Sequence, residues 1–198
     1  MKKTARILSF ILLFIGFSFF FVKGNLFGKD KEIPLGEIKG IIVDSNKNIY
    51  VGCGFYDRIQ VYDKSGKFIK NWKISAYNGD FTINFSKDEN ISIVTLKNDQ
   101  KTVYSKVGKK IYTKPFNSEN YIKTKRNLKS FETNDNNIYE IKGNFLHRKI
   151  IINNEKTIIN QSIWLQFFNS SKNILLIILL GIIIGILGKR KNTVYNNV

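Results

Sequence analysis

Uncharged apolar residues fill both ends of the chain, whereas short alternating apolar and polar runs fill its middle. The run from Ile7 to Val22 and the run from Ile174 to Gly188 contain no charged residue. Extended to Phe27, the first run would form a helix about 31 Å long, close to the hydrocarbon thickness of a bilayer. We therefore expect transmembrane helices within residues 1–27 and 163–188.

The first apolar run has a second interpretation. A basic start followed by an apolar stretch is also typical of a cleaved secretory signal, and Val-Lys-Gly at 22–24 would offer a cleavage site. The run is long for a signal peptide and rich in Phe, which favours an uncleaved anchor. Both interpretations place the middle of the chain outside the cytoplasm.

Clusters of basic residues flank the two apolar runs on their outer sides. Because basic flanks stay in the cytoplasm, we expect both termini inside and residues 28–162 outside the plasma membrane of a bacterium. Residues 189–198 would then form a basic cytoplasmic tail. The frequent use of Lys, Asn and Ile is typical of AT-rich bacterial genomes. The charges expected at the membrane interface are Lys2, Lys3, Arg6, Lys189, Arg190 and Lys191.

Two glycines interrupt the second apolar run at a spacing of four residues. Gly181 and Gly185 would flatten one face of a helix, so that a second helix could approach closely. This spacing predicts a helix–helix contact, and a contact between two copies would make the protein a homodimer.

The exterior segment consists of short alternating runs separated by turn residues, which indicates an antiparallel all-β domain. The segment also repeats. A shift of 42 residues places Asn48 on Asn90, Tyr62 on Tyr104 and Gly66 on Gly108. A further shift of 47 places Asn90 on Asn137. Three units of about 42–47 residues, each with four short strands, have the dimensions of β-propeller blades.

The first unit resembles the NHL type of propeller repeat. The resemblance implies a blade whose strands pack between stacked neighbours, with Asn48 and Gly66 in tight turns that accept a left-handed backbone. Lyases that resemble this repeat bind metal with several histidines, whereas this chain has one. The matching segments read Gly-Ile-Ile-Val-Asp at 40–44, Asn-Ile-Tyr-Val at 48–51, Arg-Ile-Gln-Val-Tyr-Asp at 58–63 and Gly-Lys-Phe-Ile at 66–69.

Three units are too few to close a propeller ring, because at least four blades are usual. Three arrangements remain open. Two chains could supply three blades each and form a six-bladed ring. The strands could instead form a compact open stack of sheets or a small barrel-like domain. The array could also be a truncated propeller, or one that a partner completes.

Few residues of the exterior segment offer catalytic chemistry. The sequence lacks a phosphate-binding glycine loop and a nucleophile elbow, and one Cys and one His exclude multi-Cys and His-cluster metal sites within the chain. We expect His147 to be a strand residue with a satisfied ring and Cys53 to be a buried or reduced thiol, an interchain disulfide being the alternative. We therefore predict no catalytic, cofactor or metal site.

The formal net charge of the chain is +17. Six of the 32 Lys and Arg residues lie in the membrane-flanking clusters, so the remainder keeps 26 basic against 15 acidic residues. Such a surface would attract anionic lipid headgroups or acidic envelope polymers. An exported domain makes nucleic acid an improbable partner. Solvated strand faces explain the same charge without a partner.

These patterns predict a membrane-anchored, extracytoplasmic interaction module, an accessory component of a membrane or envelope complex. It would bind the bilayer together with a protein partner or an anionic envelope polymer. Two alternatives stay open. One is an envelope lyase or hydrolase on a propeller-like scaffold, in which Asp44, Asp57, Asp63 and His147 would be the residues to replace. The other is a small membrane-active or immunity-type protein.

Overall fold

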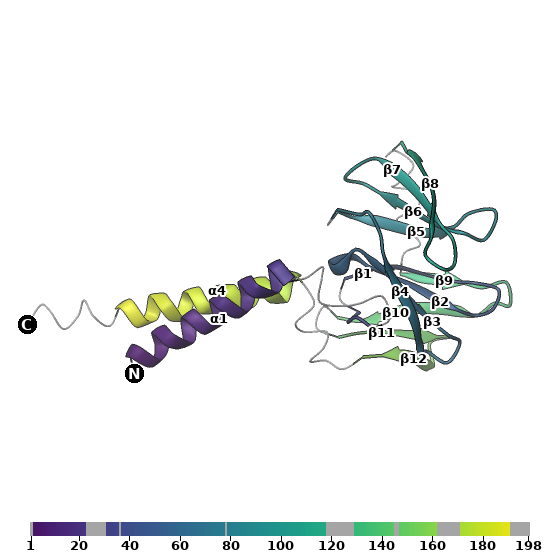
Figure 1. Ribbon diagram of the computed structural model, residues 1–198. Helices are drawn as coiled ribbons and strands as arrows, with labels where there is room; N and C mark the ends of the chain where they lie inside the picture. The colour runs from purple at the N-terminus through teal and green to yellow at the C-terminus, as the bar shows by residue number, and fades with distance from the viewer. Residues whose placement is uncertain are drawn as a thin grey trace, which may run out of the picture.

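The three repeat units form three four-stranded antiparallel sheets, and two helices lie beside each other away from them (Figure 1). The prediction of an all-β domain built from propeller-like blades is thereby confirmed. The computed structural model describes residues 2–22, 31–35, 37–77, 79–117, 129–144, 147–161 and 171–190.

Each sheet is a simple meander in which every strand pairs with the next one along the chain. In the first sheet the 3₁₀ turn η1 (Gly54–Tyr56) connects β2 to β3. Strands β2, β6 and β10 begin at the positions that the repeat shifts of 42 and 47 relate. The strands are β1 (Ile38–Val43), β2 (Ile49–Cys53), β3 (Arg58–Tyr62) and β4 (Phe68–Lys73) in the first sheet; β5 (Phe81–Phe85), β6 (Ile91–Thr95), β7 (Gln100–Tyr104) and β8 (Lys110–Pro115) in the second; and β9 (Ser130–Glu132), β10 (Ile138–Gly143), β11 (Arg148–Ile152) and β12 (Lys156–Asn160) in the third.

Equivalent turns connect the first two strands of each sheet. In the first sheet the Asp44 carboxylate accepts hydrogen bonds from the backbone N–H of Asn46 and of Asn48, at 3.0 and 2.8 Å. The left-handed residue of this turn is Lys47, with φ +65°, and its counterparts are Glu89 and Asn136. The expectation that Asn48 itself is left-handed was therefore wrong, because Asn48 already belongs to the extended segment that enters β2.

Glycines in the turns before β4 and β8 let neighbouring sheets approach closely. Gly66 has φ +83° and Gly108 has φ +86°, so the left-handed prediction for Gly66 is confirmed. A Cβ on Gly66 would lie 2.1 Å from the carbonyl oxygen of Ile158 in β12, and one on Gly108 would lie 2.7 Å from the Trp72 ring in β4. These turns therefore pack against the outermost strand of the adjacent sheet.

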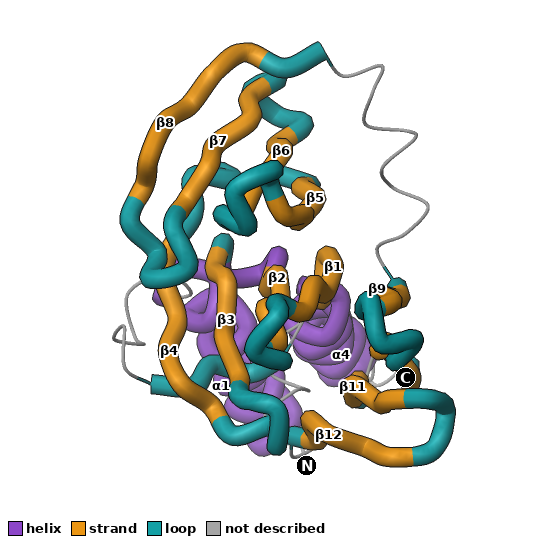
Figure 2. Tube along the Cα trace, turned by 90° about the vertical axis from the view of Figure 1, so that its right-hand side faces the viewer, coloured by secondary structure: helices purple, strands orange, loops and turns teal. Residues whose placement is uncertain are grey.

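The first sheet lies between the other two (Figure 2). Strand β1 contacts β5 on one side and both β9 and β10 on the other. One face of the first sheet presents Tyr50, Val61 and Trp72 to a core shared with the second sheet. The opposite face presents residues such as Val51 and Tyr62 to a core shared with the third sheet. In space the order of the sheets is therefore second, first, third, which differs from their order along the chain.

The outward faces of the two flanking sheets are rich in polar residues. In the third sheet, Glu140 and Lys142 lie on the face opposite to Tyr139 and form an ion pair at 3.1 Å. In the second sheet, Lys101 and Lys114 are paired across strands on the face away from the first sheet. In the second sheet this face also carries the buried side chains of Val94 and Val103, so polar residues occupy only part of it. Whether the three sheets form an open stack or half of a six-bladed ring stays a prediction.

The helices α1 (Lys2–Val22) and α4 (Ser171–Arg190) form an antiparallel pair. Small residues line the contact: Ala5 lies opposite Gly188, and Ser9 lies opposite Gly185. The Ser9 hydroxyl donates a buried hydrogen bond of 2.7 Å to the carbonyl oxygen of Gly181. Contacts between small residues, together with hydroxyl–carbonyl hydrogen bonds, are typical of helices that pack within membranes.

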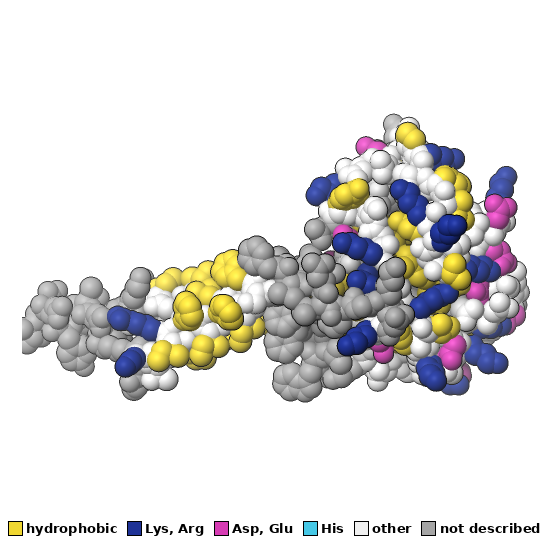
Figure 3. All heavy atoms as spheres, in the orientation of Figure 1, with side chains coloured by type: hydrophobic (Ala, Val, Ile, Leu, Met, Phe, Trp, Pro, Cys, Tyr) yellow, Lys and Arg dark blue, Asp and Glu magenta, His cyan; other side chains and the backbone are white. Residues whose placement is uncertain are grey.

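Outside this contact, the two helices expose large apolar side chains, and Figure 3 shows them on the face turned to the viewer. Phe10 is 71 % exposed, Phe14 66 % and Leu187 58 %. Within the described part of the chain, no helix is long and apolar enough to cross a membrane, so the structure does not show the transmembrane helices expected within residues 1–27 and 163–188.

Candidate binding surfaces

The β domain has two ends, which we define by the chain segments that meet there. The turn end carries the β1–β2, β5–β6 and β9–β10 turns. The helix end carries the start of β1 and the end of β12, together with residues 31–35 before β1 and Gln161 after β12. These residues meet, because the Gln161 amide accepts a hydrogen bond from the N–H of Leu35 and donates to the carbonyl oxygen of Ile33.

Residues 31–35 are fixed to the first sheet by side-chain amides. Gln60 in β3 is fully buried, accepts a 2.7 Å hydrogen bond from the Ile33 N–H and donates one of 2.7 Å to the Ile33 carbonyl. Asn71 in β4 donates to the carbonyl of Lys31. These side chains thus satisfy backbone groups that a neighbouring strand would otherwise pair. We call this arrangement the amide clasp. Its one signal in the sequence is a Gln at the centre of an apolar strand.

A pocket of about 440 Å³ lies at the turn end, where equivalent turns of all three sheets meet. Phe85 and Phe131 form its apolar part, with ring centroids 6.2 Å apart in an edge-to-face arrangement. Asp44, Glu89 and Asp135 supply carboxylates. The pocket therefore combines an aromatic surface with an acidic rim.

The carboxylates of this pocket are engaged by neighbouring groups. Asp44 accepts hydrogen bonds from its own turn and from the Tyr50 hydroxyl, at 3.0 Å. Glu89 pairs with Lys106, and Asp135 pairs with Lys47. The Lys47 ammonium holds the pKa of Asp135 at about 2, so this carboxylate is ionised at neutral pH. The carboxylates of this pocket are therefore committed to contacts within the fold.

A second pocket, of about 340 Å³, lies at the helix end. It is lined by Lys39 of β1, Lys129 before β9 and Arg148 of β11, with Asp80 as the acidic member. Ile38 and Ile141 contribute apolar surface. This pocket is therefore mainly basic, in contrast to the one at the turn end.

The residues named for an envelope enzyme do not converge. Asp44 and Asp63 lie in turns at the turn end, whereas Asp57 and His147 precede β3 and β11 at the helix end. A five-residue strand separates the two ends by roughly 17 Å. A ring nitrogen of His147 lies 3.0 Å from the carbonyl oxygen of Gln161, so its ring has a partner, as expected. The expectation that His147 is a strand residue was wrong, because β11 begins at Arg148. Over the described ranges, no set of three or more His, Cys, Asp or Glu side chains could hold a metal ion.

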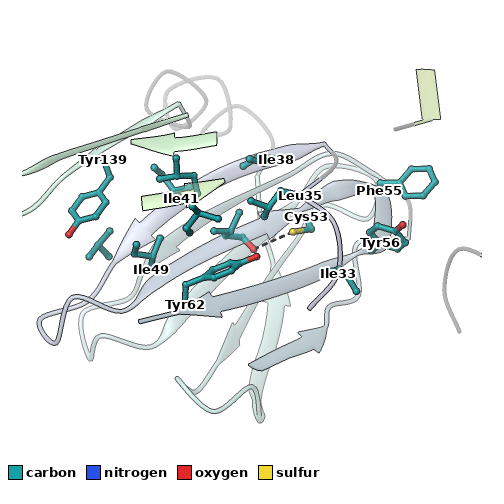
Figure 4. Packing of buried hydrophobic residues seen from close by; sticks show 14 of the residues in the cluster. Ile33, Leu35, Ile38, Ile41, Ile49, Cys53, Phe55, Tyr56, Tyr62 and Tyr139 are labelled. Carbon is teal, nitrogen blue, oxygen red and sulfur yellow. Dashed lines mark hydrogen bonds between the residues drawn. The ribbon is translucent and has the colours of Figure 1, made fainter. Parts of the chain in front are cut away.

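Cys53 is fully buried within the core shared by the first and third sheets (Figure 4). Burial raises the pKa of its thiol to about 12. The buried-thiol interpretation of this residue is confirmed.

We expect Cys53 to resist thiol reagents in the folded protein, because a buried thiol with a raised pKa supplies almost no accessible thiolate. Incubation of the native chain with a maleimide at pH 7.5 should leave it unmodified by mass spectrometry. The same treatment in denaturant should add one label. Rapid labelling of the native chain would contradict this burial.

The helix pair brings the two basic flanks to one end. Because Ala5 lies opposite Gly188, the start of α1 and the end of α4 are adjacent, far from the β domain (Figure 1). Gly181 and Gly185 lie against α1 of the same chain, near Leu13 and Ser9; a contact between two copies stays a prediction. Lys3 and Arg6 are exposed on α1. Lys2, Lys189 and Arg190 lie within the helices, whereas Lys191 lies outside the described residues.

Comparisons with known proteins add little to this geometry. No family model and no curated protein matches the chain. Among solved structures, a streptogramin B lyase is similar with a TM-score of 0.38 and 15 % identity, over 64 % of this chain and 42 % of the lyase. A virginiamycin B lyase from Staphylococcus aureus is similar with a TM-score of 0.35 and 12 % identity, over 66 % of this chain and 42 % of the lyase. A protein of unknown function from Bacteroides caccae is similar with a TM-score of 0.34 and 12 % identity, over 67 % of this chain and 48 % of that protein.

This chain spans less than half the length of each of these structures. Such low similarity supports no statement about activity. The assignment of the repeat to the NHL type therefore stays a prediction from the residues of the first unit.

Proposed function

We propose that the protein is a membrane-anchored interaction module whose β domain binds a partner outside the cytoplasm. The exposed apolar surface of the α1–α4 pair carries this proposal. Side chains such as Phe10, Phe14 and Leu187 are more than half exposed. Apolar surface of this extent on a soluble monomer would be unfavourable, whereas in a bilayer it contacts lipid.

The orientation follows from the charges. Both basic flanks lie at the free end of the helix pair, and basic flanks remain on the cytoplasmic side of a bacterial membrane. The β domain at the opposite end then lies outside. Its turn end, with the aromatic and acidic pocket, points away from the helices and is the surface that we assign to a protein partner.

A membrane fractionation experiment tests the anchoring. The full chain should remain in the membrane pellet after a wash with alkaline carbonate, because apolar contact with lipid does not depend on pH or salt. Recovery of the chain in the carbonate wash would contradict anchoring by the helices.

A further inference from the structure

The helix-end pocket concentrates basic side chains beside the segments that connect to the helices. Lys39, Lys129 and Arg148 line it, with Asp80 as the acidic lining residue. These three cations come from different sheet segments, so their proximity depends on the packing of the first sheet against the third.

Two of the cations are positioned by the fold. The aliphatic stem of Lys39 lies across Gly54, where a Cβ would come within 2.2 Å of the Lys39 Cε atom. The Lys39 ammonium then lies 3.0 Å from Asp80 and 3.8 Å from Glu37. The Arg148 guanidinium donates to the carbonyl oxygen of Ile38, at 3.5 Å. Lys129 is exposed at the edge of the pocket.

The position of this pocket relates it to the membrane. The start of β1 supplies Ile38 and Lys39, and Arg148 lies beside the strand that ends at Asn160. Residues 161–170 alone separate this strand end from the start of α4. The pocket is therefore at the end of the domain that anchoring by the helices would hold at the headgroup level.

We propose that the helix-end pocket binds the phosphate group of an anionic phospholipid. This inference rests on the proposed function, because it requires the helix end to lie at a membrane surface. Arg and Lys donors match phosphate oxygens in geometry and charge. Ile38 and Ile141 provide apolar surface for the glycerol region of the same lipid. Binding of this kind would hold the β domain in one orientation on the bilayer.

Native mass spectrometry of the full chain in a neutral detergent tests the proposal. Phosphatidylglycerol and phosphatidylcholine are titrated separately against the wild type, Lys129→Gln, Lys129→Arg and the control Lys109→Gln. Lys129 is exposed, so its replacement should leave the fold intact. Lys109 is an exposed lysine at the opposite end of the domain.

We expect phosphatidylglycerol to bind more tightly than phosphatidylcholine. Lys129→Gln should weaken phosphatidylglycerol binding roughly fivefold, since each basic residue at a membrane surface contributes about that factor. Lys129→Arg should restore it, and Lys109→Gln should leave it unchanged. Equal phosphatidylglycerol binding by the wild type and Lys129→Gln would overturn the site.

Soluble competitors show whether the pocket prefers the phosphate of a lipid, free phosphate or the phosphate of an envelope polymer. Inorganic phosphate and glycerol phosphate should not displace the lipid at equal concentration; displacement by either would overturn the lipid assignment. Tighter, Lys129-dependent binding of a poly(glycerol phosphate) would overturn it in favour of an envelope polymer. All variants should still sediment with membranes, so a failure of anchoring is detected separately in the carbonate wash.

Discussion

Replacing Gln60 by alanine is expected to lower the free energy of unfolding by about 3–5 kcal/mol. The Gln60 amide forms two 2.7 Å hydrogen bonds with the backbone of Ile33, and both residues are fully buried. The substitution leaves a buried N–H and a buried carbonyl without these partners, and each such loss costs about 1–3 kcal/mol. The cavity left by the amide adds to this cost.

Denaturant unfolding of the full chain in a neutral detergent, followed by circular dichroism, measures this effect. Gln100→Ala is the matched control, because Gln100 is a partly exposed residue of β7 whose backbone carbonyl oxygen accepts a hydrogen bond from the Thr95 hydroxyl, a contact that the substitution keeps. The control should change the unfolding free energy by less than about 0.5 kcal/mol. Equal losses for Gln60→Ala and Gln100→Ala would show that the amide clasp does not hold residues 31–35.

Two aspartates on the exposed apolar surface of the helix pair are expected to release the protein from membranes. Phe14 and Ile183 are 66 % and 50 % exposed, so Phe14→Asp combined with Ile183→Asp does not disturb the helix–helix contact. Each aspartate near the centre of a membrane helix costs about 3 kcal/mol, and the pair would shift partitioning roughly 10⁴-fold. The double variant should move to the soluble or aggregated fraction of a carbonate-washed preparation.

Val107→Asp provides the control for this variant. Val107 is 70 % exposed on the β domain, so the control also places a charge on exposed apolar surface, but away from the helices. It should remain with the membranes. Retention of the double variant at wild-type levels would contradict the assignment of the helix surface to lipid.

The strands of each sheet could be predicted from the sequence, because each strand and its turns are marked by residues that lie close together along the chain. The recurrence of Asn48, Asn90 and Asn137 located the starts of β2, β6 and β10. Gly66 was correctly assigned to a left-handed turn, whereas Lys47 and not Asn48 is left-handed in the preceding turn. Either residue can satisfy a polar turn of this composition, so the sequence alone did not separate them.

Features that depend on distant contacts could not be predicted in this way. The amide clasp connects Gln60 to Ile33 across 27 residues, and Gln161 donates to the same carbonyl oxygen across 128 residues. The central position of the first sheet arises from packing of β1 against strands on both sides, which no periodicity records. The helix-end pocket was missed for the same reason: its cations lie far apart along the chain.

We propose that the helix pair anchors the chain with its β domain outside the cytoplasm. Labelling of introduced cysteines in intact bacterial cells with a membrane-impermeant maleimide tests it most directly, since the buried native Cys53 should stay unmodified. We expect Lys109→Cys, at the turn end, to react in intact cells, and Lys3→Cys, on α1, to react only after the membrane is permeabilised. Protection of Lys109→Cys in intact cells, with labelling only after permeabilisation, would contradict it.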